Sequence, residues 1–179
     1  RKQGDMSEFI KVAVDAMGGD NAPVEIVKGA IEATQENEKV KVYLVGQEDA
    51  VKAELAKYKY DAERVEVVHA SEIIETAEPP VLAIRKKKDS SLVKALTMVK
   101  DGECDAFVSA GSTGATLVGG QLIVGRLKGV ERPPLAPMIP TMTGASLLID
   151  CGANVDARPS MLVQFAKMGS IYMENVCGV

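Results

Sequence analysis

Short apolar runs alternate along the chain with longer amphipathic segments. Five of the runs are rich in β-branched residues or other apolar residues and end in glycine, polar or acidic turns, as strands do. We therefore expect strands over 9–15, 40–46, 64–70, 104–111 and 145–154. Apolar residues at helical spacing predict helices over 23–36, 48–58, 81–88, 90–102, 113–127 and 159–176.

This alternation of strands and helices is typical of βαβ units. We expect an α/β fold with a doubly wound, mainly parallel sheet and helices on both faces. The proline-rich segment 131–141 predicts an extended connection or an edge strand, because proline cannot donate to a central ladder. We interpret residues 10–179 as the α/β domain and residues 1–9 as a polar leader or a cloning remnant.

The composition narrows the class of protein. A hydrophobic content of 46% with 26% charged residues is typical of a globular domain. The net charge of −4 and the aromatic content of 4% argue against nucleic-acid binding. No apolar run reaches the roughly 18 residues of a membrane-spanning helix. The three cysteines lack metal-ligand spacing, and we expect Cys104 and Cys151 to be reduced core residues, as in a cytoplasmic protein.

Three of the expected strands end in turns of similar chemistry: DAMGGDN, SAGSTGA and DCGANVDA. Because the carboxyl ends of parallel strands meet at one edge of a sheet, we expect these turns to line one ligand site. Glycine lets a backbone approach a ligand, hydroxyls donate to phosphate oxygens, and helix N-termini favour anions. The candidate substrate- or phosphate-binding residues are Gly18, Gly19, Asp20, Ser109, Gly111, Ser112, Thr113, Gly114 and Gly152, and the candidate catalytic residues are Asp15 and Asn154.

The aspartates of these turns allow two interpretations. Asp15, Asp20, Asp150 and Asp156 could hold Mg²⁺ or orient a substrate, and equally Asp20 and Asp156 could fix turns through side-chain-to-backbone bonds. The sequence has no P-loop, no dinucleotide fingerprint after the first strand and no transition-metal spacing, so we expect neither a metal nor a cofactor. We interpret His69, the single histidine, as structural.

A basic run stands out in this acidic chain. Arg85, Lys86, Lys87 and Lys88 form either a solvated helix face or a docking surface for an acidic partner, to which Arg126 could contribute.

Six stretches, in this order, resemble the bacterial phosphate acyltransferase family PlsX: VAVDAMGGDNAPVEIVKGA, IRKKKDSSLVKAL, SAGSTGATLVGG, IVGRLKGVERPPLAP, LLIDCGANVDARP and FAKMGSIYMENVCGV. The resemblance runs from about Ile10 to the last residue. It implies transfer of a fatty acyl group from acyl carrier protein to inorganic phosphate, giving acyl-phosphate for phospholipid synthesis. It gives the basic run an acidic docking partner, the acyl carrier protein.

The resemblance also implies a fold like that of the isocitrate and isopropylmalate dehydrogenases, a homodimer, and a cytoplasmic location with peripheral association at the membrane surface. Members of the family continue well beyond the position of Val179, which implies that this chain is an N-terminal portion and is inactive alone. Two other functions fit the same residues. One is a phosphotransacetylase-like enzyme that uses an acyl-CoA, and the other is a non-catalytic module that binds an acidic carrier protein.

Overall fold

The computed structural model describes residues 9–178, so the expected polar leader lies outside the described residues except for Phe9. The chain forms two compact units, Arg1–Val124 (unit 1) and Gly125–Val179 (unit 2). The domain boundaries expected from the sequence stay a prediction.

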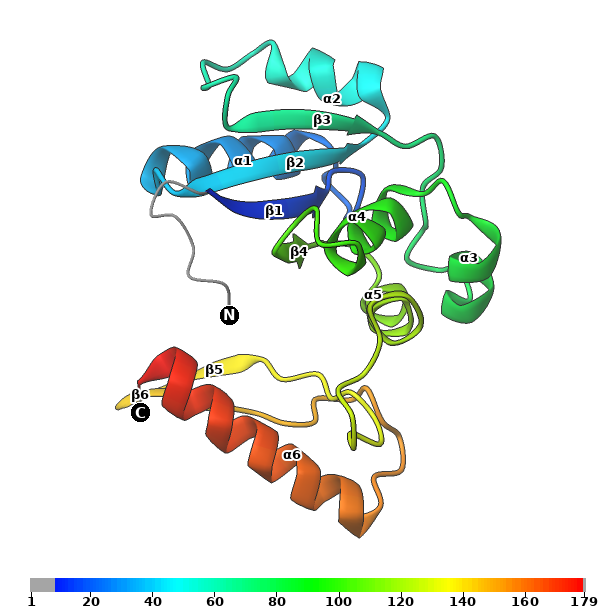
Figure 1. Ribbon diagram of the computed structural model, residues 1–179, viewed down its shortest axis with the longest axis vertical. Helices are drawn as coiled ribbons and strands as arrows, with labels where there is room; N and C mark the ends of the chain where they lie inside the picture. The colour runs from blue at the N-terminus through cyan, green and yellow to red at the C-terminus, as the bar shows by residue number, and fades with distance from the viewer. Residues whose placement is uncertain (1–8, 179) are drawn as a thin grey trace. The chain divides into compact units, whose positions relative to one another are not determined.

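Unit 1 contains four strands and five α-helices within its described residues. In chain order they are β1 (Ile10–Asp15), α1 (Val24–Glu36), β2 (Val40–Gly46), α2 (Glu48–Leu55), β3 (Val65–His69), α3 (Pro80–Lys86), α4 (Ser91–Lys100), β4 (Ala106–Val108) and α5 (Thr113–Gly119), which continues as the π-helical turn η1 (Gly120–Val124). The four strands form one sheet in the order β3-β2-β1-β4, and all three pairings are parallel (Figure 1). The prediction of a parallel α/β sheet is therefore confirmed.

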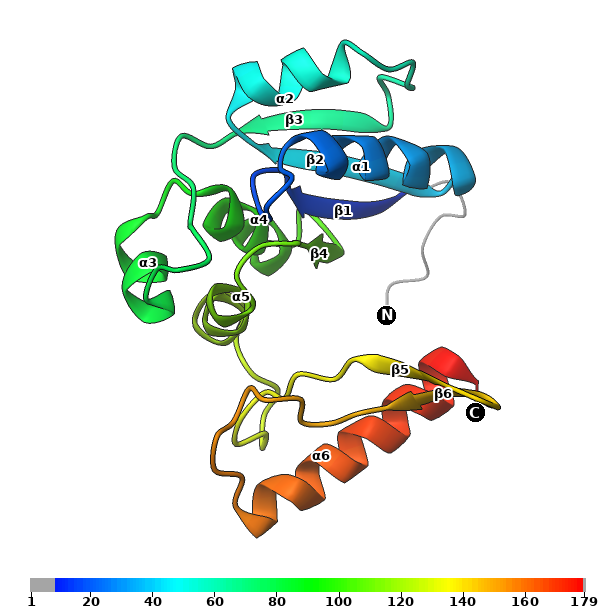
Figure 2. The ribbon, with the colours of Figure 1, turned by 180° about the vertical axis from the view of Figure 1, so that it is seen from behind.

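Helices cover both faces of this sheet because the strand residues alternate in direction. Val14 and Leu44, which are register partners, pack with Val27 of α1 and Val51 of α2 in one buried cluster. Their strand neighbours Ala13 and Val45 join the cluster that contains Ala95 and Met98 of α4. Helix α1 accordingly lies behind the sheet in Figure 1 and in front of it in Figure 2. The predicted helical layers on both faces are confirmed.

Local signals fix the ends of α4, which lies within the helix predicted over 90–102. The Ser90 side chain accepts a hydrogen bond from the backbone N–H of Val93, and this bond caps the first turn. The helix ends at Lys100, and Gly102 follows with a φ of +77°, a conformation that glycine adopts without steric cost. Cys104, just beyond this turn, is buried as expected, whereas Cys151 in unit 2 is only partly buried.

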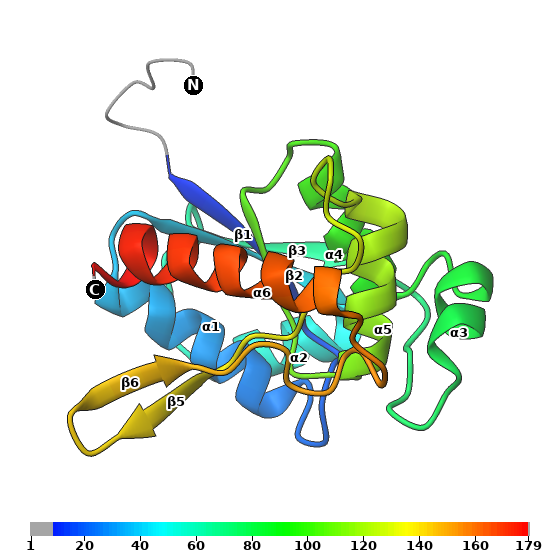
Figure 3. The same ribbon diagram turned by 90° about the horizontal axis from the view of Figure 1, so that it is seen from below.

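Unit 2 corrects one prediction. The expected fifth parallel strand over 145–154 is instead β6 (Gly144–Leu147), which pairs antiparallel with β5 (Met138–Thr141) in a separate two-stranded sheet. Figure 3 shows the two strands side by side as a hairpin. The loop between them has two residues, a length that favours a hairpin. Unit 2 also contains α6 (Pro159–Tyr172), which starts at the predicted proline and continues as the π-helical turn η2 (Met173–Cys177).

The segment 131–141 was predicted to be an extended connection or an edge strand, and β5 within it is an edge strand. Pro140 lies in this ribbon opposite Ala145, where each strand has only one neighbour and tolerates proline. Met161 and Phe165 of α6 supply the buried apolar side chains of unit 2.

Candidate phosphate site

The site in unit 1 is built around the carboxylate of Asp15, the last residue of β1. Asp15 is only 2% exposed, and its Oδ2 atom accepts a hydrogen bond of 2.8 Å from the hydroxyl of Ser109. Its Oδ1 atom accepts a bond of 3.3 Å from the backbone N–H of Met17. Ser109 follows β4, which pairs with β1, so the parallel sheet brings together two residues that are 94 positions apart.

Ser109 also bonds to the turn that follows β4. We call the hydrogen-bonded pair of Asp15 and Ser109 the Asp15–Ser109 clasp. The Ser109 Oγ atom accepts a bond of 3.0 Å from the backbone N–H of Gly111. A serine hydroxyl has one proton, and here that proton is directed to Asp15. In this arrangement Ser109 shapes the turn after β4 and keeps no proton for a phosphate oxygen.

Glycine allows the two turns to touch through their backbones. A Cβ atom on Gly18 would lie 2.5 Å from Asp15 Oδ2 and 2.8 Å from Ser109 Oγ. A Cβ atom on Gly111 would lie 3.1 Å from the Cα atom of Gly18. Gly19 has a φ of +103°, and a Cβ atom there would lie 2.9 Å from the carbonyl oxygen of Ala110. Both turns therefore depend on glycine for their contact with each other.

The remaining candidates after β4 have different exposures. Ser112 is buried and caps α5, because its Oγ atom accepts a bond of 3.2 Å from the N–H of Ala115. Thr113, the first residue of α5, is exposed. Gly114 lies against α3: a Cβ atom on it would be 2.7 Å from Cγ of Pro80. Pro80 is not among the residues predicted from the sequence, because no sequence signal links it to a glycine 34 positions later.

The other acidic candidate of the first turn, Asp20, is exposed. Within residues 9–178, no three His, Cys, Asp or Glu side chains gather closely enough to hold a metal ion. His69 is also exposed, and its backbone carbonyl accepts a bond of 2.7 Å from the Lys94 ammonium group.

The third glycine turn belongs to unit 2. The Asp150 carboxylate accepts hydrogen bonds from the backbone N–H groups of Leu135 (2.7 Å), Ala153 (3.3 Å) and Asn154 (2.7 Å). The side-chain amide of Asn154 donates to Asp150 Oδ2 at 2.9 Å and to the Pro133 carbonyl at 3.3 Å. Gly152, with a φ of +82°, makes the turn that these bonds close. Asn154 therefore holds the turn together.

Stability should depend on pH through Asp150. Partial burial opposes ionisation, but the hydrogen bonds from Leu135, Asn154 and Ala153 outweigh it and hold the pKa of the Asp150 carboxyl below its usual value. A depressed pKa gives stability that is present above the unfolded pKa of about 3.9 and is lost as the pH falls below it. We expect Asp150→Asn to lower the free energy of unfolding at pH 7 by about 1–2 kcal/mol.

Denaturant unfolding between pH 7 and pH 2.5 checks this prediction. The difference between the wild type and Asp150→Asn should shrink toward the lowest pH, while Asp156→Asn, at an exposed position, should match the wild type throughout. A constant difference across the whole range would contradict the role of the Asp150 charge.

The residues of the basic run have different environments in the structure. Arg85 and Lys86 at the end of α3 are exposed, and so is Lys88. The Lys87 ammonium group instead donates a bond of 2.6 Å to the Ile73 carbonyl and pairs with Glu78. Arg126 belongs to unit 2, where its guanidinium donates to the Glu131 carbonyl.

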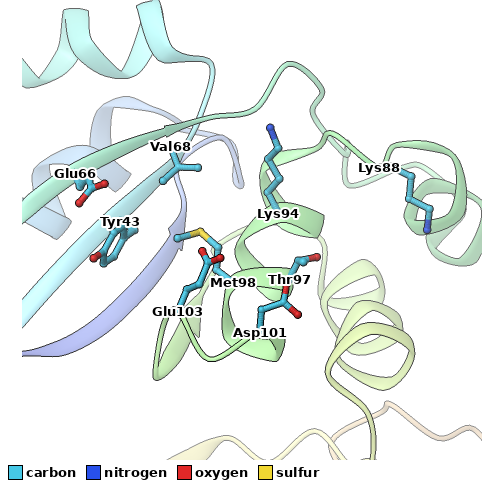
Figure 4. A pocket seen from close by; sticks show the side chains of 9 residues that line it. All are labelled: Tyr43, Glu66, Val68, Lys88, Lys94, Thr97, Met98, Asp101 and Glu103. Atoms are coloured by element: carbon cyan, nitrogen blue, oxygen red, sulfur yellow. The ribbon is translucent and has the colours of Figure 1, made fainter.

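Unit 1 also has an open pocket of about 370 Å³, which Figure 4 shows. It lies over β2 and β3 beside α4, and its apolar floor includes Tyr43, Val68 and Met98. Its lining runs along α4 from Asp101 and Glu103, which precede β4, to Lys94, whose ammonium group bonds the carbonyl of His69 at the end of β3. The pocket therefore covers one face of the sheet and does not lie beyond the carboxyl ends of the strands. Ligands of open parallel sheets bind at the carboxyl ends, where the Asp15–Ser109 clasp is. The clasp and its two glycine turns are therefore the stronger candidate site.

Comparisons with known proteins identify the family. The family described as "Fatty acid synthesis protein" matches residues 10–179. The chain belongs to this family. This result confirms the resemblance to the PlsX phosphate acyltransferases.

The phosphate acyltransferases of Clostridium perfringens and Clostridium beijerinckii are each 55% identical over 170 residues. The match covers 95% of this chain and 50% and 51% of those proteins, so the chain spans about half the length of these curated relatives.

A solved structure shows the same fold. A phosphotransacetylase from Streptococcus pyogenes matches with a TM-score of 0.64 at 17% identity, over 88% of this chain and 51% of that one. At this identity the likeness concerns the fold alone. The expected likeness to the isocitrate and isopropylmalate dehydrogenases stays a prediction. Among the described residues, no helix is both long and apolar enough to cross a membrane.

Proposed function

We propose that this chain forms one side of the phosphate site of a phosphate acyltransferase, an enzyme that moves a fatty acyl group from acyl carrier protein to inorganic phosphate. The observation that carries the proposal is the Asp15–Ser109 clasp, which holds two glycine turns together at the carboxyl edge of a parallel sheet. The family match supports the reaction, because its curated relatives are named phosphate acyltransferases.

In the proposed reaction, phosphate is the nucleophile and no covalent acyl-enzyme forms. A phosphate oxygen attacks the thioester carbonyl, a C–O bond forms and the C–S bond breaks. The carrier thiolate leaves and takes the proton that hydrogen phosphate loses. The protein's task is to position the phosphate and the acyl carbonyl and to stabilise the charge that develops. These needs are met by N–H groups and hydroxyls, not by a redox cofactor.

The first turn of α5 is the proposed phosphate contact. The N–H groups of Thr113 and Gly114 lie in this turn, where N–H groups have no partner within a helix, and the exposed Thr113 hydroxyl adds a donor. Asp15 and Ser109 hold the turn in place from behind. We propose that Asn154 contributes to catalysis by fixing the turn around Gly152 through its bonds to Asp150.

The carrier protein is proposed to dock on the exposed cations of the basic run. Arg85, Lys86 and Lys88 give a local positive surface in a chain of net charge −4, which would steer an acidic carrier. Arg126 is included in this proposal as a residue of unit 2. A homodimer, and a cytoplasmic location at the membrane surface, belong to the same proposal because they follow from the family resemblance.

The test is an acyl-phosphate assay on the protein expressed from its natural reading frame. Long-chain acyl carrier protein plus phosphate should give acyl-phosphate and free carrier thiol in equal amounts. Turnover with acetyl-CoA but not with acyl carrier protein would replace the proposal with a phosphotransacetylase-like reaction. Carrier binding without any acyl-phosphate would instead indicate a non-catalytic binding module.

A further inference from the structure

Residues 72–90, between β3 and α4, form a loop whose two ends are bonded to each other. Glu72 and Ser90 form an isolated parallel bridge, and the backbone N–H of Asp89 donates to Glu72 Oε2 at 3.0 Å. The Asp89 carboxylate pairs with Lys94 at 2.6 Å and accepts a bond of 2.9 Å from the Ser71 N–H. The Lys94 ammonium and the Ser71 donors hold the pKa of Asp89 well below its usual range. Residues 72–90 are therefore a closed loop anchored at the start of α4.

Lys87 ties the interior of this loop together. Its ammonium group bridges the Ile73 carbonyl, at 2.6 Å, and the Glu78 carboxylate, at 2.5 Å. Glu78 Oε1 also accepts a bond of 2.8 Å from the Glu75 N–H. The bond from Lys87 and the bond from Glu75 hold the pKa of Glu78 below its usual value. Both partners are only partly exposed, 30% for the Lys87 side chain and 28% for that of Glu78.

The same loop carries α3, and α3 packs against α5 at two places. At the start of α5, Pro80 lies so close to Gly114 that a Cβ atom would come within 2.7 Å of its ring. At the end of α5, a Cβ atom on Gly119 would lie 3.3 Å from Cδ1 of Ile84. Ile84 also shares a buried cluster with Ala115. The position of α3 therefore determines the space available to the first turn of α5.

We propose that Lys87 is a positioning residue for the first turn of α5, acting through the loop 72–90 and the contact between Pro80 and Gly114. The proposal rests on the phosphate site proposed above. It separates Lys87 from Arg85, Lys86 and Lys88, which are exposed and available to a partner. Loss of the Lys87 bridge frees the loop, loosens α3 and widens the α5 turn that is proposed to hold phosphate.

The experiment uses the protein from its natural reading frame with Lys87→Met, which removes the ammonium group and keeps the apolar stem. Lys28→Met, at an exposed position of α1, is the matched control. Amide hydrogen exchange of Ala115 and Thr116, whose N–H groups bond to Ser112 in the first turn of α5, should accelerate roughly threefold to tenfold in Lys87→Met and stay unchanged in Lys28→Met. The KM for inorganic phosphate should rise by a similar factor, with the KM for the acyl donor unchanged.

Three further variants sharpen the test. Glu78→Gln, which keeps the shape and removes the charge, should move the exchange rate in the same direction, and Lys87→Arg should restore it toward the wild type. Lys86→Met should leave the exchange of Ala115 and Thr116 unchanged and, if the docking proposal holds, raise the KM for acyl carrier protein.

The exchange measurement needs no enzymatic activity, so it separates the two proposals. Unchanged exchange in a folded Lys87→Met protein overturns the positioning role, and so does a KM that rises for the acyl donor and not for phosphate. Faster exchange in a protein whose wild type makes no acyl-phosphate supports the coupling between Lys87 and α5 and overturns the proposed function.

Discussion

Gly18→Ala is expected to abolish most acyl transfer and to destabilise unit 1. The added methyl carbon would lie 2.5 Å from Asp15 Oδ2, 2.8 Å from Ser109 Oγ and 3.0 Å from Asp15 Cγ. These atoms cannot move aside freely, because Asp15 is buried and bonded at both oxygens. We expect a loss of about 1–3 kcal/mol in the free energy of unfolding from overpacking. Displacement of the turns should reduce turnover on the order of 100-fold.

Gly29→Ala provides the matched control for this substitution. Gly29 lies in the middle of α1, is exposed, and has no heavy atom within 4 Å of an added Cβ. Alanine there should stabilise the protein by roughly 0.5–1 kcal/mol, because alanine has the higher helix propensity. Guanidinium unfolding and the acyl-phosphate assay measure both effects. Wild-type stability and turnover in Gly18→Ala would show that the two turns do not need to touch.

The sequence predicted the parallel sheet well because its signals are local and repeated. Each βαβ unit carries an apolar run, a polar turn and an amphipathic helix, and the parallel topology follows from their alternation. The same logic placed Asp15 and Ser109 at one edge of the sheet. It could not predict their 2.8 Å bond, because that bond depends on the pairing of β1 with β4 and on the missing side chain of Gly18.

The errors have physical causes as well. The apolar run 145–154 was assigned to the parallel sheet because its composition is that of a buried strand. Its actual pairing is set by the two-residue loop Met142–Thr143, which lacks the Asn-Gly or Asp-Gly signal of a hairpin turn. Lys87 was grouped with its basic neighbours because charge is visible in a sequence, whereas a carbonyl acceptor such as Ile73 is not.

The role of Asp15 can be tested with two substitutions that differ in one property. Asp15→Ala removes the buried acceptor of Ser109 and leaves the partly buried Ser109 hydroxyl without that partner, which should cost about 1–3 kcal/mol of stability. The released turn after β4 should lower turnover on the order of 100-fold. Asp15→Asn keeps the size and one acceptor oxygen, so it should lose less stability and retain at least roughly tenfold more activity than Asp15→Ala, since about 1.4 kcal/mol of retained positioning corresponds to a factor of ten.

The comparison between these variants decides how the carboxylate acts. If Asp15 works by holding Ser109 and the turn after β4, the neutral asparagine replaces it in large part, because the Ser109 hydroxyl still has an oxygen to donate to. If turnover is equally low in both variants while Asp15→Asn unfolds like the wild type, the negative charge itself is required and Asp15 touches the reacting groups. Asp20→Ala is the stability control, because Asp20 is exposed and its removal should leave the free energy of unfolding unchanged. A drop in turnover in that variant alone would assign the substrate contact of the first turn to Asp20.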